Sequence, residues 1–389
     1  MSTRVNPDLR NELLKFGIGD WNACYHCGNC TAICPLSETG FLFPRKKIRL
    51  MQMGLEDKLA SSVEPWLCYY CGDCSETCPR EANPGELMMS LRRYLTSVYD
   101  WTGLSKKFYT SEVWELSFIL AMAAMVVVFF LKFLPAMGYT FTRELTTEGG
   151  VKINSFAPPD IMEMLDWIMA VIVAGLLISN ILRMYYKIVW KYTNTKVSLW
   201  VHIREFWRLI FNFAVQPKFS KCGSRQYWLS HWLLMSGYTI MFILIVVYLP
   251  WFQTEKVLPW WHPQRSLGYY ATFGLLFGLI FVLVGRLRRK SVKFRFSHMS
   301  DWLFIVMLTL TVSSGILVHL FRVNGMAMAT YVSYIFHIAI LVPMILIEVP
   351  FSKWSHLAYR PFAVYFQQLQ KYAVPRKGSK TTPLWKRSG

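Results

Sequence analysis

The first 80 residues carry the same cysteine spacing twice, and each copy ends in Cys-Pro. The cysteines are Cys24, Cys27, Cys30 and Cys34 in the first run, and Cys68, Cys71, Cys74 and Cys78 in the second. This C-x2-C-x2-C-x3-C-P spacing is typical of a pair of [4Fe-4S] clusters, in which the fourth cysteine of each run binds the cluster held by the other run. We therefore predict one cluster on Cys24, Cys27, Cys30 and Cys78, and a second on Cys68, Cys71, Cys74 and Cys34.

Zinc is the alternative ligand for a cysteine-rich segment. A tetrahedral zinc site is usually built from two C-x2-4-C halves separated by a longer loop. Four cysteines within one short stretch, followed by a second such stretch, do not suit that arrangement. The spacing therefore indicates a redox protein.

The chain divides into two unlike parts. It has 389 residues, 54% of them hydrophobic, and the long apolar runs begin only after residue 112. Residues 1–105 are polar and cysteine-rich, which predicts a helical di-cluster ferredoxin domain. The opening residues are charged and contain no apolar run, so we expect no signal peptide and a cytoplasmic location for this domain. Residues 106–367 are predicted to form a transmembrane domain.

Six apolar runs are long enough to cross a bilayer. They cover 113–136, 161–189, 227–252, 268–285, 300–321 and 328–350. With the first domain inside, the inner connecting segments hold 23 Lys and Arg and the outer ones 5. This asymmetry predicts a multi-pass protein of the cytoplasmic membrane with both termini in the cytoplasm. It also explains the net charge of +19 without nucleic-acid binding.

Two further segments have a distinctive pattern. Residues 197–213 alternate apolar and charged side chains at helical spacing, which predicts an amphipathic helix lying on the inner membrane surface. Residues 368–389 are rich in Lys, Pro, Gly and Ser, and predict a basic flexible tail. Together these features predict an all-α protein.

Histidines in the apolar half are candidate ligands of b-type haem, because electrons from the clusters need a carrier inside the bilayer. His231 and His356 both lie near the predicted cytoplasmic face and are expected to hold an inner haem. His337 lies inside the sixth span, and His319 near the outer end of the fifth, so they are the candidates for an outer haem. Because 19 residues correspond to about 28 Å of helix, His337 and His356 are not expected to bind the same iron.

The residues discussed so far resemble two known families. Residues 20–96, with CYHCGNCTAICP and WLCYYCGDCSETCPR, resemble the C subunit of heterodisulfide reductase, a helical protein with two [4Fe-4S] clusters. Residues 195–367 resemble the cytochrome b subunit of respiratory nitrate reductase, through WLSHWLLMSGYTI and YIFHIAILVPMILIEVPFSKWSHLAYRPF. That family has a second histidine about ten residues after the one matching His231, and this chain has Ile240-Met241 there. One or two haems b are therefore expected.

The fusion of these two modules resembles the QmoC family, the membrane subunits of quinone-interacting oxidoreductase complexes of sulfate reducers. The resemblance implies QmoA-like and QmoB-like flavin and iron-sulfur partner subunits. It also implies electron exchange between menaquinol and adenylylsulfate reductase in sulfate respiration. The fold it implies is a six-helix transmembrane cytochrome b bundle that follows the ferredoxin domain.

We therefore predict an electron-transfer subunit of a quinone-interacting oxidoreductase, with no catalytic residues of its own for a further substrate. The candidates for contact with quinone are Arg322, Glu348, Lys353 and Arg360. Glu348 has a structural alternative, as a helix-end carboxylate paired with Lys353 or Arg360. Two other functions stay open: a heterodisulfide-reductase-like or nitrate-reductase-like anchor feeding a different soluble reductase, and a transporter with a metal-binding domain.

Overall fold

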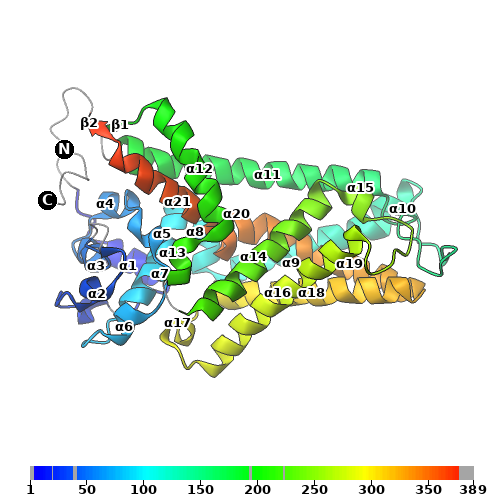
Figure 1. Cartoon of the computed structure of the whole chain (residues 1–389), viewed down its shortest axis with the longest axis horizontal. Helices are drawn as coiled ribbons and strands as arrows, with labels where there is room; N and C mark the ends of the chain where they lie inside the picture. Colours follow the sequence, from blue (N-terminus) through cyan, green and yellow to red (C-terminus); the bar gives the residue numbers. More distant parts are fainter. Residues whose placement is uncertain (1–3, 20, 38–41, 192–194, 222–223, 376–389) are drawn as a thin grey trace.

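The structure, a computed structural model, describes residues 4–375 except residues 20, 38–41, 192–194 and 222–223. The fold is all-α, as expected. Long helices run side by side along the longest axis, and a group of short helices lies at one end of them (Figure 1). The described residues also contain two short strands, β1 (Thr195–Lys196) and β2 (Val374–Pro375), which pair antiparallel.

The N-terminal domain is built from short helices around one long one. Its elements are α1 (Leu9–Leu14), the 3-10 turn η1 (Trp21–Ala23), α2 (Asn29–Ile33), α3 (Arg45–Gln52), α4 (Glu56–Ala60), α5 (Glu64–Leu67), α6 (Asp73–Glu76), α7 (Pro84–Tyr99) and α8 (Leu104–Thr110). Along α7, Leu87, Leu91 and Leu95 recur every four residues and are fully buried. This apolar stripe is the reason the shorter helices pack around α7.

Six helices are long and apolar enough to cross a membrane. They are Glu112–Ala136, Pro159–Trp190, Arg225–Val246, Pro263–Arg288, Met299–Val323 and Ala327–Phe351. All six predicted runs lie within or overlap these helices. The third helix ends six residues earlier than predicted, at Val246, because the chain turns there and Leu249–Phe252 form the separate short helix α15.

The first, second and sixth of these helices are interrupted by π-helical turns. Their elements are α9 (Glu112–Val128), η3 (Phe129–Phe133) and α10 (Leu134–Ala136); α11 (Pro159–Tyr185) and η4 (Tyr186–Lys191); and α19 (Ala327–Pro343), η5 (Met344–Glu348) and α20 (Val349–Phe351). The remaining membrane helices are α14 (Arg225–Val246), α16 (Pro263–Arg288) and α18 (Met299–Val323). A short helix, α17 (Val292–Arg295), links α16 to α18.

The chain leaves the sixth membrane helix at Ser352, which has an extended backbone (φ −124°, ψ −142°). A 3-10 turn, η6 (Lys353–Ser355), follows, and His356 is the first residue of a new helix, α21 (His356–Lys371). The sequence suggested that His337 and His356 lie on one continuous helix. The structure shows that they lie on two separate helices. Their separation in space is set by this break as well as by helical rise.

The amphipathic segment forms α12 (Leu199–Val215), followed by α13 (Pro217–Lys221). Trp200, Ile203 and Trp207 on α12 are exposed, whereas Glu205 is buried and pairs with Arg208 at 2.8 Å. The exposed apolar face suits contact with lipid, while the opposite face covers α21.

The C-terminal tail begins later than predicted. Gln368 and Leu369 are buried within α21, which continues to Lys371, and Val374–Pro375 form strand β2. The expected tail from residue 368 is therefore wrong for its first part, because α21 packs on α11 and α12. The rest of it, 376–389, lies outside the described residues.

Three aromatic rings join the N-terminal domain to α21. The ring centroid of Trp66 lies 4.9 Å from that of Tyr359, and the Tyr99 and Tyr359 centroids are 5.7 Å apart. All three side chains are almost completely buried in one apolar cluster that extends from α1 to α21. The two parts of the chain therefore share a core.

Replacing Trp66 with alanine should destabilise this shared core. Removing a large buried aromatic side chain typically costs about 3–5 kcal/mol, so the thermal midpoint of the purified protein in detergent should fall by several degrees. Trp260→Ala is the matched control, because Trp260 is 71% exposed. An equal midpoint for the two variants would contradict a shared core.

Candidate functional site

The two cysteine runs fold in the same way. Gly28 and Gly72 occupy equivalent places and have left-handed backbone angles, φ +96° and +100°. They precede the short helices α2 and α6, which begin just before the third cysteine of each run. The preceding His26 and Tyr70 are also left-handed, at φ +63° and +55°. This repeated turn curls each run so that its first three cysteines face the same side.

A small cavity of about 20 Å³ lies inside the first run. The cysteines that line it are Cys24, Cys27, Cys30 and Cys78, with Arg45 and Arg80 beside them. Cys78 thus lies with the first run although it belongs to the second. Burial raises the pKa of Cys30, and its neighbours Cys24, Cys27 and Cys78 raise it further. The thiolate is the form of cysteine that binds iron. Cationic iron at this place would offset the negative charge that burial and the neighbouring cysteines make unfavourable.

Cys34 makes the reciprocal crossing. Burial raises the pKa of Cys34 to about 12, and the nearby Cys68 and Cys71 also raise it. Cys74 has the same neighbours, Cys68, Cys71 and Cys34. The structure therefore groups the cysteines as crossed ligation requires. Within the described residues, no three His, Cys, Asp or Glu side chains surround a point that would hold a single metal ion.

Two arginines contact the start of the second run. Arg92 and Arg360 both donate hydrogen bonds to the carbonyl oxygen of Cys68, Arg360 at 3.2 Å. Burial, together with the positive charge of Arg360, lowers the pKa of Arg92 to about 10. Placing two cations here is electrostatically unfavourable unless an anionic group lies nearby. An iron-sulfur cluster with four thiolate ligands supplies such a group.

A chain of aromatic contacts leads from the second cysteine run to the first membrane histidine. The guanidinium of Arg360 lies 3.7 Å from the ring centroid of Tyr69, the residue after Cys68. The Tyr69 ring stacks on Phe219 of α13, with centroids 5.1 Å apart. Phe219 in turn meets the His231 ring edge to face at 5.2 Å. The cluster domain and the membrane histidine are thus in contact through two side chains.

His231 and His356 face the same small cavity, of about 30 Å³. His231 comes from α14, and His356 from the first turn of α21. The Nδ1 atom of His356 bonds to the carbonyl oxygen of Lys353 at 2.7 Å, whereas Nδ1 of His231 has no hydrogen-bond partner among the described residues. Burial lowers the pKa of His356 to about 3, so its imidazole is neutral and suits binding to a metal.

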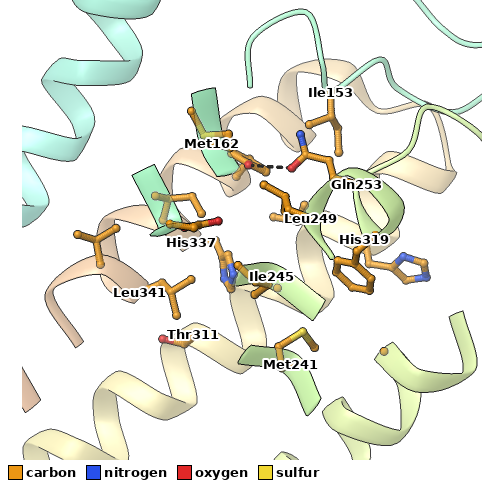
Figure 2. A pocket seen from close by; sticks show the side chains of 18 of the residues that line it. Ile153, Met162, Met241, Ile245, Leu249, Gln253, Thr311, His319, His337 and Leu341 are labelled. Atoms are coloured by element: carbon orange, nitrogen blue, oxygen red, sulfur yellow. Dashed lines mark hydrogen bonds between the residues drawn. The ribbon is translucent and has the colours of Figure 1, made fainter. Parts of the chain in front are cut away.

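A much larger cavity, of about 910 Å³, lies between the membrane helices. Its walls come from α9, α11, α14, α16, α18 and α19, and most of its lining is apolar. Both His319 and His337 line it. Figure 2 shows that the His337 ring points into the middle of the cavity, whereas the His319 ring points away from His337 at the edge of the view. The volume is at the upper end of the range of roughly 300–1,000 Å³ that is usual for ligand sites.

His337 and His319 differ in their partners. His337 shares a hydrogen bond of 2.9 Å between Nδ1 and the hydroxyl of Ser314. The imidazole of His319 interacts with Arg265 at 2.7 Å and with the hydroxyl of Tyr269 at 3.1 Å. The structure therefore brings the two histidines to one cavity but does not aim them at each other.

The four candidate quinone contacts are not brought together. Arg322 lines the large cavity, and its side chain donates to the carbonyl oxygen of Thr254. Arg360 is at the cysteine run, and Lys353 pairs with Asp301. Glu348 is fully buried and lies beside Glu115. The alternative that paired Glu348 with Lys353 or Arg360 does not hold, because those cations are engaged elsewhere.

Glu115 is a site residue that the sequence pattern gives no reason to select, because it stands alone near the start of an apolar run. It lies on α9, is 1% exposed, and accepts a hydrogen bond of 2.8 Å from the hydroxyl of Ser352. Its buried neighbour is Glu348. Two carboxyl groups thus lie side by side away from water, where two negative charges would repel each other.

Comparisons with known proteins agree with the N-terminal geometry. Residues 20–82 match the family model described as 4Fe-4S dicluster domain. A protein of Archaeoglobus profundus, named as similar to the C subunit of heterodisulfide reductase, is 42% identical over 98 residues, which are 25% of this chain and 52% of that protein. The second C-type iron-sulfur subunit of CoB–CoM heterodisulfide reductase from Methanocaldococcus jannaschii is 34% identical over 96 residues, 23% of this chain and 51% of that protein.

These similarities cover only the N-terminal part. The chain spans about half the length of the first curated relatives it matches. No solved structure matches. The comparisons thus support iron-sulfur electron transfer by a 4Fe-4S dicluster domain that precedes six membrane-spanning helices.

Crossed ligation can be tested with two single substitutions. Cys34→Ser should damage the cluster bound by Cys68, Cys71 and Cys74, whereas Cys30→Ser should damage the other one, because Cys34 lies with the second run. Electron paramagnetic resonance of the reduced protein, with iron counted per chain, distinguishes the two clusters. If Cys34→Ser affected only the cluster of Cys24, Cys27 and Cys30, the crossed assignment would be wrong.

Proposed function

We propose that this chain is the membrane electron-transfer subunit of a quinone-interacting oxidoreductase. In this proposal menaquinol is oxidised among the membrane helices, and electrons reach soluble partner subunits through b-type haem and the two [4Fe-4S] clusters. When bound, haem and clusters supply reversible one-electron chemistry. The residues of the chain bind these groups, hold them at fixed positions and exclude water.

The ring contacts that lead from Tyr69 to His231 are the observation that carries this proposal. Tyr69 and Phe219 connect the second cysteine run to His231 through ring contacts, with the guanidinium of Arg360 over both rings. A metal-binding domain that merely regulated a transporter would need no such contact with a buried histidine pair. Close packing of this kind supports a proposed inner haem next to the proposed second cluster.

Binding of a haem by His231 and His356 requires a local rearrangement. The cavity between them, of about 30 Å³, is far smaller than a porphyrin. Phe213 and Gln216 line it from the α12–α13 segment. These side chains must withdraw when the haem binds, whereas the two imidazoles already face the same space. The rings of His231 and His356 line one cavity, as two ligands of one haem would.

The orientation and the partners follow from the position of the cluster domain. Both clusters would lie outside the bilayer, at the end of the molecule from which α12 and α21 also extend (Figure 1). We propose that this end is cytoplasmic and docks QmoA-like and QmoB-like subunits. In the QmoC-like interpretation these subunits pass electrons on to adenylylsulfate reductase.

The relatives favour a second candidate. Two of them are named as iron-sulfur subunits of CoB–CoM heterodisulfide reductase. The chain could therefore anchor a heterodisulfide-reductase-like complex that feeds a different soluble reductase. Identification of the subunits that copurify with the chain separates the two candidates, since both predict the same haem and clusters here.

His231→Ala and His356→Ala should each remove one haem, and it should be the same haem, because each residue would supply one axial nitrogen. Pyridine haemochrome assay of the purified variants should show one haem fewer per chain, and the clusters should no longer be reduced by a quinol analogue. His262→Ala is the control, since His262 caps the start of α16 and its side chain lines neither cavity. Full haem content in both variants would refute this part of the proposal.

Quinol is proposed to bind at the rim of the large cavity beside His319 and Arg322. His319 lies at the end of α18 that is remote from the cluster domain, and its interactions with Arg265 and Tyr269 connect it to polar groups there. Oxidation at this rim would release protons on the outer side.

Proteoliposomes containing the complex test the position of the quinol site. With quinol inside the membrane and an electron acceptor on the cytoplasmic side, turnover should acidify the outer side and build up a membrane potential. Arg322→Gln should slow quinol oxidation by about an order of magnitude through loss of a charged hydrogen bond, while dithionite still reduces the haem. Turnover without charge movement would place the quinol site on the inner side instead.

A further inference from the structure

The large cavity is lined by the thioether of a methionine as well as by the imidazole of His337. Met241 of α14 lines the same cavity as His337 of α19, although the two helices come from different parts of the chain. In Figure 2 the ring of His337 lies near the middle of the view with Ile245 beside it, and the side chain of Met241 lies below them. A thioether and an imidazole on facing walls are the donors that a six-coordinate haem iron can take.

His337 is oriented as an axial ligand should be. Its Nδ1 atom is engaged by the hydroxyl of Ser314, which leaves Nε2 as the free nitrogen. Gly315 makes room for the ring, because a β-carbon there would lie 3.2 Å from Cε1 of His337. A second-sphere hydrogen bond that fixes the imidazole is a common feature of histidines that bind metals.

The direction of the side chains favours Met241 rather than His319 as the partner of His337. In Figure 2 the His319 ring points away from His337, and it interacts with Arg265 and with the hydroxyl of Tyr269. Met241 lines the same cavity as His337.

The outer rim of the cavity carries basic side chains that form no ion pair with an acidic residue in the described part of the chain. Arg265 and Arg322 both line it, and Nε of Arg322 is buried without a hydrogen-bond partner among the described residues. Haem carries two propionate carboxylates, and a guanidinium binds a carboxylate in a planar, charge-assisted geometry. The cavity thus offers axial donors in its middle and cations at one end.

We propose that His337 and Met241 are the two axial ligands of a haem b in this cavity, with Arg265 binding one of its propionates. This inference rests on the proposed function, since it assumes that the chain binds haem. It leaves His319 free for the quinol at the rim. Methionine stabilises ferrous iron relative to histidine, so His/Met ligation raises the reduction potential above that of a bis-histidine haem. The outer haem would then have the higher potential of the two.

The purified full-length chain with its haems tests the assignment. Oxidised wild-type protein should show the near-infrared charge-transfer band of methionine-bound ferric haem, which bis-histidine haem lacks. Met241→Leu should abolish that band and lower the midpoint potential of one haem only. Met241→His should restore six-coordination with a bis-histidine spectrum and a potential below that of wild type. Met169→Leu, on the α11 wall of the same cavity, is the control and should change neither band nor potential.

The outcomes separate this inference from the function on which it rests. Wild-type protein without haem after expression with sufficient haem supply would overturn both. If haem is present and His337→Ala removes one equivalent, but Met241→Leu keeps the band and the potential of wild type, the Met241 assignment alone is wrong. The absence of the near-infrared band from wild type would overturn it as well.

Discussion

The guanidinium of Arg360 fixes α21, which follows the membrane helices, against the N-terminal domain. It lies against the ring of Tyr69 and donates to the carbonyl oxygen of Cys68, so a cation on α21 is fixed to the second cysteine run. Arg360 follows His356 by four residues, and residues four apart share one face of a helix. The contact that anchors α21 to the cluster domain therefore also points His356 toward His231.

Much of this arrangement could be predicted because it depends on local sequence. The cysteine spacing determines how many thiols can surround one point, and the crossing of Cys34 and Cys78 follows from the same spacing. The six membrane helices could be predicted because length and apolarity alone decide whether a helix spans a bilayer. The position of His356 beside His231 was expected from their shared depth near one end of the helices.

Other features depend on packing that the sequence pattern does not reveal. The break at Ser352 and the π turn at Met344–Glu348 change the direction of the sixth span, so distance along a helix was a poor guide beyond His337. Phe219 was not selected because it lies in a short basic segment with no apolar pattern. In the sequence, Ile240-Met241 stood out only as a place without a histidine, and the ligand role that we propose for Met241 depends on its place in the wall of the large cavity.

The crossing of the cysteines has a consequence for how the domain is assembled. With the proposed ligands, one cluster ties Cys78 to cysteines about fifty positions earlier, and the other ties Cys34 to cysteines about 34–40 positions later, so the two clusters act as a pair of crossed covalent links. A link that closes a long loop removes conformational entropy from the unfolded chain, as a disulfide does. Neither cysteine run could then bind a complete cluster without a ligand from the other run. Iron insertion and folding of the domain would then be coupled, because each cluster would need ligands from both cysteine runs.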